Sequence, residues 1–235
     1  MAAYRNPALP PDAVGGGDPM TGDATATTPV VPDERFALPA QDHQLTRAAH
    51  ALARRGFAVE ILDDAAAARA RIRDLLQEGS TVFTSTSETL RLSGIEDDIN
   101  TSGRYRPIKP LVRSMDRATR MDEIRSLIAT PQVVVGSVAA VTETGSLLAA
   151  SNTGSQVPAY AGGAARRIWI VGAQKVVPDL GTALRRIETY AYPLEDVRAR
   201  AAYGKPSAMN EVLIVNGEPV QGRTRVLLLR QAIGY

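Results

Sequence analysis

The sequence contains no cysteine and only two histidines, His43 and His50. Without cysteine the chain cannot form a disulfide framework, a cysteine-ligated zinc site or a cysteine-ligated iron–sulfur cluster. On a helix the two histidines would stand two turns apart, about 10 Å, which is too far to share one metal ion. We therefore expect no metal or cofactor site, and any catalysis would fall to acidic, basic or hydroxyl side chains or to backbone amides.

Aromatic residues are also scarce, at 5%, although hydrophobic residues in total make up 44% of the chain. The core must therefore rely on Ala, Val, Leu and Ile, which favours a helix-rich α/β protein. The net charge of +2 gives no reason to expect a nucleic-acid partner. No apolar run approaches the ~20 residues of a membrane span, and the N-terminus lacks the apolar segment of a signal peptide. We expect a cytoplasmic protein that does not enter the membrane.

Residues 1–35 are rich in proline and glycine and show neither helical nor strand periodicity. Such a segment cannot bury enough apolar surface to offset the entropy lost on ordering, so we expect a disordered tail. An arm that docks onto a partner subunit is the alternative. The rest, 36–235, is expected to form one domain, because no second linker and no internal repeat interrupt it.

The folded part alternates between helical and strand patterns joined by short connections. Predicted helices cover 42–56, 64–78, 87–95, 116–130 and 178–191, with a further helical segment to 203. Predicted strands cover 57–62, 80–85, 131–138, 147–150 and 166–173. Residues 99–113 are expected to be an irregular connector, and 211–229 two strands joined by an Asn-Gly turn. This alternation predicts an α/β fold with a parallel sheet.

Ligands of parallel sheets bind where loops gather at the carboxyl ends of the strands. The first such loop is "TSTSE", residues 84–88, between a predicted strand and a predicted helix. Thr84, Ser85 and Ser87 offer hydroxyl groups there, and backbone amides at a helix N-terminus can hold a phosphate or a carboxylate. Capping of the helix by Ser85 or Ser87 is the alternative, and the two roles are compatible.

The second loop lies in "TETGSLLAASNTGSQVP", residues 142–158, where Glu143 and Gly145 occupy a predicted turn after a buried strand. In one interpretation the turn merely reverses the chain and Glu143 is solvated. In the other, Glu143 is a nucleophile, a general acid or base, or a hydrogen-bond anchor. The anion-binding residues beside it would then be Asn152, Thr153 and Gly154.

The third loop, "VGAQK", ends at Lys175, which would either bind a ligand carboxylate or phosphate or pair with a surface acidic residue. Neither the G-x-x-x-x-G-K-[ST] nor the G-x-G-x-x-G nucleotide signature occurs, and no G-x-S-x-G elbow occurs. Because all three loops follow strands, we predict that they converge on one site. The converging segments would be 84–88, 142–145, 151–156 and 172–175.

Three stretches occur in order along the chain: "STVFTSTSETLRLSGI", "VVVGSVAAVTETGSLLAASNTGSQVPAYAGGAARRIWIVGAQKVVPDLGTALRRI" and "YAYPLEDVRARAAYG". Together, over roughly residues 40–235, they resemble the LUD domain family, which includes lactate-utilisation proteins of the LutC type. The E-x-G turn, the following N-x-G-x block and the lysine after the next strand carry the resemblance. The fold of this family is similar to that of the NagB/RpiA/CoA-transferase group. The resemblance therefore implies a three-layer α/β/α sandwich with a mostly parallel sheet.

The resemblance also implies a role in the oxidation of L-lactate to pyruvate, in a complex with iron–sulfur subunits. Since the chain has no cysteine, it would bind a small carboxylate or phosphate ligand, or a partner subunit, and carry no cluster of its own. The related CoA-transferases imply an alternative, an enzyme acting on an acyl-CoA or a sugar phosphate with Glu143 as nucleophile or base. A non-catalytic binding protein is the third possibility, and a homo-oligomer is compatible with each.

Overall fold

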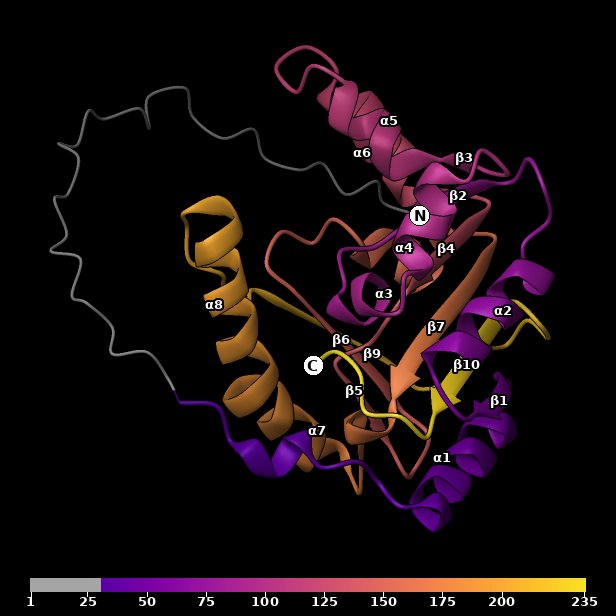
Figure 1. The fold of residues 1–235 in the computed structure, drawn as a ribbon, viewed down its shortest axis with the longest axis vertical. Coiled ribbons are helices and arrows are strands. Elements are labelled where there is room, and N and C mark those ends of the chain that lie inside the picture. Colours follow the sequence, from indigo (N-terminus) through magenta and orange to yellow (C-terminus); the bar gives the residue numbers. More distant parts are fainter. Residues whose placement is uncertain (1–30) are drawn as a thin grey trace, which may run out of the picture.

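The structure, a computed structural model, describes residues 31–235 (Figure 1), and residues 1–30 lie outside the described part. Most of the predicted tail therefore falls outside it. The predicted domain start lies inside a 3-10 helix, η1 (Glu34–Ala37). The chain already contacts the domain three residues before the predicted start, because the Asp33 backbone N–H donates to the carbonyl of Thr189.

A six-stranded sheet runs through the domain, and every neighbouring pair of its strands is parallel. The strand order is β1-β10-β7-β4-β2-β3. The strands are β1 (Ala58–Leu62), β2 (Thr81–Thr84), β3 (Arg106–Pro107), β4 (Val133–Gly136), β7 (Arg166–Gly172) and β10 (Thr224–Leu229). Valine-rich β4 is buried throughout, as expected for the interior of a parallel sheet.

Helices cover both faces of this sheet, which confirms the predicted α/β/α arrangement (Figure 1). Side chains alternate between the faces, so that in β7 Ile168 packs on one side and Trp169 on the other. The Ile168 side is covered by α2 (Ala65–Leu75), α3 (Glu88–Leu92) and α4 (Ile95–Thr101). The Trp169 side is covered by α1 (Asp42–Arg54), α5 (Ile108–Ser114), α6 (Met121–Ala129) and a second, smaller sheet.

The small sheet has the order β8-β5-β6-β9. Its strands are β5 (Ala140–Thr142), β6 (Leu147–Ser151), β8 (Val176–Val177) and β9 (Glu211–Val215). β5 and β6 pair antiparallel across the "TETG" turn, so the predicted chain reversal is present. Against its outer face pack α7 (Leu180–Arg186) and the helical turn η4 (Ile187–Ala191), from which α8 (Tyr192–Tyr203) continues (Figure 1).

The last two strands do not form the predicted hairpin, because β9 belongs to the small sheet and β10 to the large one. A type I′ Asn-Gly turn needs positive φ at both central residues, and Gly217 is not among the described glycines that have it. Instead the Asn216 side chain accepts a hydrogen bond from the Ser146 hydroxyl, and Glu218 is buried against Arg167. These contacts anchor the connection between the two sheets.

Two segments predicted to be loops contain regular structure. The expected connector over 99–113 holds the end of α4, the short strand β3 and α5. Ile108 and Val112 pack on one face of α5, and Pro110 stands in its first turn, where proline is tolerated. The segment between the predicted strands over 131–138 and 147–150 holds β5, which pairs with both β6 and β8. Long-range pairing and burial therefore outweigh the local turn signals.

Candidate functional site

A cavity of about 480 Å³ lies at the carboxyl ends of β2 and β4. Its first wall comes from the β2–α3 loop (85–88) and the β4–β5 loop (137–139). Its other walls come from the end of β6 with the following loop (149–156), from α8 and from residues 205–209. The cavity thus occupies the place where ligands of open parallel sheets bind.

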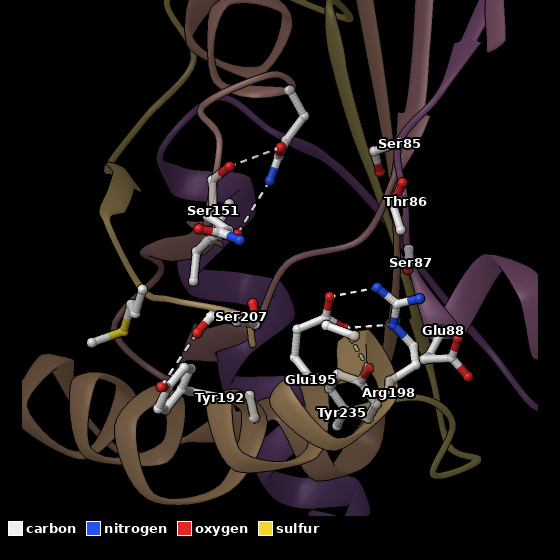
Figure 2. Close-up of a pocket in the computed structure, with 18 of the residues that line it drawn as sticks. Ser85, Thr86, Ser87, Glu88, Ser151, Tyr192, Glu195, Arg198, Ser207 and Tyr235 are labelled. Atoms are coloured by element: carbon white, nitrogen blue, oxygen red, sulfur yellow. Dashed lines mark hydrogen bonds and ion pairs between the residues drawn. The ribbon is translucent and has the colours of Figure 1, made fainter. Parts of the chain in front are cut away.

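Hydroxyl groups and one ion pair dominate the close view of the cavity. Figure 2 shows Ser85, Thr86 and Ser87 along one wall, Ser151 across from them, and the side chains from α8 below. The lining therefore offers many hydrogen-bond donors and acceptors to a polar ligand, while alanine and tyrosine side chains supply the apolar part.

Tyr160 connects the two loops of the first wall. Its hydroxyl lies 2.8 Å from the Ser85 hydroxyl and donates to the backbone carbonyl of Ser137 at 3.0 Å. Burial raises the pKa of Tyr160 to about 12, so the phenol stays protonated and remains a donor. A side chain at Gly136 would overlap the Tyr160 hydroxyl oxygen, so the close approach of the ring depends on glycine at the end of β4.

Lys175 lies in the wall beside these groups, at the end of the 3-10 turn η3 (Ala173–Lys175), and is only 2% exposed. Its Nζ donates to the Thr89 hydroxyl (2.9 Å), the Ser137 hydroxyl (3.0 Å) and the carbonyl of Val138 (3.1 Å). Within residues 31–235, no carboxylate lies at ion-pair distance from it. Burial, reinforced by the charge of Arg186, holds the pKa of Lys175 well below its usual value. The environment of Lys175 therefore favours the neutral amine more than water does.

An ion pair between two side chains of α8 also lines the cavity. Arg198 donates to both oxygens of Glu195, at 2.8 and 2.6 Å, and the Tyr235 hydroxyl donates to the same carboxylate at 2.6 Å. Figure 2 shows these three side chains grouped together. Burial and the bond to Glu195 raise the pKa of Tyr235, so its hydroxyl stays protonated.

Most of the predicted site residues line this cavity. Those that do are Ser85, Ser87, Asn152, Thr153 and Lys175. Thr84 is fully buried below the cavity and hydrogen-bonds the Asn100 side chain. Ser87 accepts the N–H of Leu90, so it caps α3 as the alternative interpretation predicted. Gly154 is outside the lining, but its N–H donates to Ser151, which stabilises the lining loop.

Glu143 and Gly145 are not among the residues that line the cavity, although the Glu143 backbone N–H donates to the carbonyl of Val177, two residues after Lys175. The turn and the cavity lie at opposite ends of β6, an extended strand that rises about 3.3 Å per residue. The Glu143 carboxylate instead binds α1, accepting hydrogen bonds from Gln44 (3.1 Å) and Arg47 (2.5 Å). Burial acts to raise the pKa of Glu143, but these hydrogen bonds outweigh burial, and the pKa is lowered overall. A catalytic role for Glu143 stays a prediction.

Sequence reasoning missed Ser137, Tyr160, Arg198 and Tyr235 as lining residues. Ser137 was assigned to the end of a strand, yet β4 ends one residue earlier and leaves Ser137 in a carboxyl-end loop. The other three come from segments far from the strand ends in sequence. No motif marks them, so only the packing of α8 and the chain end against the sheet identifies them.

The described residues 31–235 hold no group of three or more His, Asp or Glu side chains placed to bind a metal ion. Nor does any helix in this range have the length and apolar character needed to cross a membrane.

Comparison with known proteins gives a family and a similar solved structure. The family model described as the LUD domain matches residues 45–229. The crystal structure of a DUF162 family protein from Deinococcus radiodurans at 1.70 Å resolution has a TM-score of 0.48 to this chain and 12% sequence identity. That match covers 80% of this chain and 96% of the other. A search of curated proteins found no match.

Proposed function

Because the chain belongs to the LUD domain family, we propose that it acts in the oxidation of L-lactate to pyruvate and binds a small carboxylate beside Lys175. The family as a whole is associated with lactate utilisation. The observation that carries the ligand site is the buried amine of Lys175, which stands in a hydroxyl-rich cavity wall and has no carboxylate partner within the described residues.

A ligand carboxylate would supply the counter-charge that this amine lacks. An anion beside Lys175 favours its charged form and raises its pKa again, so binding takes up a proton. A hydrogen bond between charged partners contributes about 1.5–3 kcal/mol net, more than a neutral one. The hydroxyls of Ser85 and Ser137, which share the wall with Lys175, are further hydrogen-bonding groups near the same ligand.

Electron transfer in this proposal takes place on partner subunits. The chain has no cysteine, so a cysteine-ligated iron–sulfur cluster must be held by another chain. We therefore include iron–sulfur subunits of a lactate-oxidation complex among the proposed partners. Co-purification of such subunits with the full chain from its native cells tests this part of the proposal separately.

Calorimetric titration of the full chain with L-lactate and with pyruvate tests the ligand site. In two buffers of different ionisation enthalpy, we expect the heats to report uptake of up to about one proton per ligand. Lys175→Met should abolish the uptake and weaken binding about tenfold or more, equivalent to about 1.4 kcal/mol. Lys109→Met is the matched control, because that lysine pairs with Glu96 outside the cavity. Binding that is unchanged in Lys175→Met, or no binding of either acid to the wild type, would refute the proposal.

A further inference from the structure

We propose that Ser137 and Lys175 form a serine–lysine dyad that hydrolyses esters or thioesters of small carboxylic acids in the cavity. The inference rests on the ligand site of the proposed function, because the acid bound beside Lys175 would be the product of the reaction. The two residues are 38 positions apart, so only the fold brings them together.

The placement of the two side chains meets the requirement for an activated nucleophile. Ser137 Oγ lies 3.0 Å from Lys175 Nζ, within the hydrogen-bond distance that a nucleophile and its base need. Both residues line the cavity, and Ser137 is half-buried at the carboxyl end of β4. The hydrogen bond from Tyr160 to the Ser137 carbonyl holds this loop in place. Serine–lysine pairs are a recognised variant of the serine nucleophile with a histidine base.

The three contacts of Lys175 Nζ, written above with the amine as donor, can also be made by a neutral amine that accepts from Ser137. A neutral amine has two N–H donors and one acceptor position. The Val138 carbonyl can only accept, and the Thr89 hydroxyl is itself committed as a donor to the Ile233 carbonyl, so each takes one N–H. The lone pair can then accept from the Ser137 hydroxyl once that hydroxyl turns away from the Val138 carbonyl, to which it donates at 3.3 Å. Burial and the charge of Arg186 lower the pKa of Lys175, which favours this form.

The reaction balances with water as the only co-reactant. Ser137 Oγ attacks the carbonyl carbon while its proton passes to Lys175 Nζ, and the bond to the leaving oxygen or sulfur breaks as that atom takes the proton from Lys175. Water then attacks the acyl-serine, gives its proton to Lys175, and the Ser137 oxygen leaves and is reprotonated. The products are the acid and an alcohol or thiol.

The size of the cavity favours an acyl derivative over a free small acid. Pockets for drug-sized ligands span about 300–1,000 Å³, and this cavity, at about 480 Å³, falls within that range. A three-carbon acid would occupy only part of it, which leaves room for an alcohol or thiol group attached to the acyl carbon. A neutral ester at the reacting carbonyl also leaves Lys175 uncharged until the acid is released.

Hydrolysis of p-nitrophenyl acetate by the full chain is the first test. We expect a burst of p-nitrophenol and one acetyl group on Ser137 by mass spectrometry of peptides. Ser137→Ala and Lys175→Met should each lower the rate about 100-fold or more, the usual effect of losing a general base or its nucleophile. Ser114→Ala, an exposed serine of α5, should leave the rate unchanged. A wild-type rate in Ser137→Ala would overturn the dyad.

Cysteine substitution at position 137 gives a second test that does not depend on the substrate. Because the chain contains no cysteine, Ser137→Cys introduces a single thiol, which Lys175 should deprotonate. We expect iodoacetamide to alkylate it near neutral pH about tenfold faster than the thiol of Ser114→Cys, and this gain to vanish in Ser137→Cys combined with Lys175→Met. If position 137 reacts no faster than position 114, the dyad is refuted, whereas the carboxylate titrations decide the proposed function separately.

Discussion

Replacing Glu218 with glutamine removes the carboxylate on which the connection between the two sheets depends. Glu218 is buried and accepts hydrogen bonds from the Thr224 hydroxyl (2.6 Å), from Arg223 (3.0 Å) and from the backbone N–H of Val220 (2.9 Å). It also pairs directly with Arg167, which is 2% exposed. The amide of glutamine keeps the shape of the side chain but leaves the buried arginine without its counter-charge.

The pKa of Glu218 sets the size of the effect. Burial alone would raise it, but the hydrogen bonds from Arg223, Thr224, Val220 and Arg167 outweigh burial and lower it from 4.5 to about 2. At ~1.36 kcal/mol per pKa unit, this difference corresponds to about 3 kcal/mol. Because the folded-state pKa is the lower one, the stabilisation is present above about pH 4.5 and is lost as the pH falls toward 2. Burial lowers the pKa of Arg167, which still stays charged in this acidic range.

Urea unfolding between pH 7 and pH 2.5 tests this reasoning. We expect Glu218→Gln to lower the free energy of unfolding by about 3 kcal/mol at pH 7, and by progressively less below pH 4.5, where the wild-type carboxyl itself becomes protonated. Glu123→Gln is the control, since its partner Arg120 is exposed and the pair should contribute less than about 1 kcal/mol. A difference that stays constant with pH, or a loss below about 1 kcal/mol at pH 7, would contradict the assignment.

Two further predictions concern the cavity and the turn. Gly136→Ala should lower the free energy of unfolding by about 1–3 kcal/mol, because the added methyl overlaps the Tyr160 hydroxyl; an unchanged melting temperature would count against this contact. Glu143→Gln should cost at most about 1 kcal/mol, since Arg47 is 54% exposed, and should leave the binding of lactate and pyruvate unchanged in calorimetry. Loss of binding or of ester hydrolysis in Glu143→Gln would instead restore the catalytic role first considered for it.

Parallel strands made much of the site predictable from sequence. Their carboxyl ends meet at one edge of a sheet, so the loop beginning at Ser85 and the lysine after β7 could be brought together without a structure. The same reasoning does not place Glu143 in the cavity lining, because Glu143 lies in the turn of the antiparallel β5–β6 hairpin. Sequence order identifies strand ends, whereas strand direction within a second sheet decides which end faces the ligand.

The remaining features depend on contacts between distant segments. The Asn-Gly turn at 216–217 is a strong local hairpin signal, yet the burial of Glu218 against Arg167 sends the two flanking strands into different sheets. Likewise, the amine of Lys175 meets the Ser137 hydroxyl only because β4 and β7 are neighbours in the large sheet. No local pattern encodes either contact, so periodicity and capping rules cannot reveal them.

The buried charge network and the cavity are physically joined, which gives Glu218→Gln a second consequence. Arg167, held by Glu218, also donates to the backbone carbonyl of Tyr160, and Tyr160 in turn donates to the carbonyl of Ser137. Without its carboxylate partner, the buried charge of Arg167 is destabilised, which favours movement of the arginine away from the Tyr160 carbonyl. The Tyr160 ring and the Ser137 loop then lose a hydrogen bond that fixes their position. We therefore expect Glu218→Gln, but not Glu123→Gln, to slow alkylation of a cysteine at position 137 under conditions where both proteins are folded. Equal alkylation rates in the two backgrounds would show that the cavity wall holds its geometry without the network.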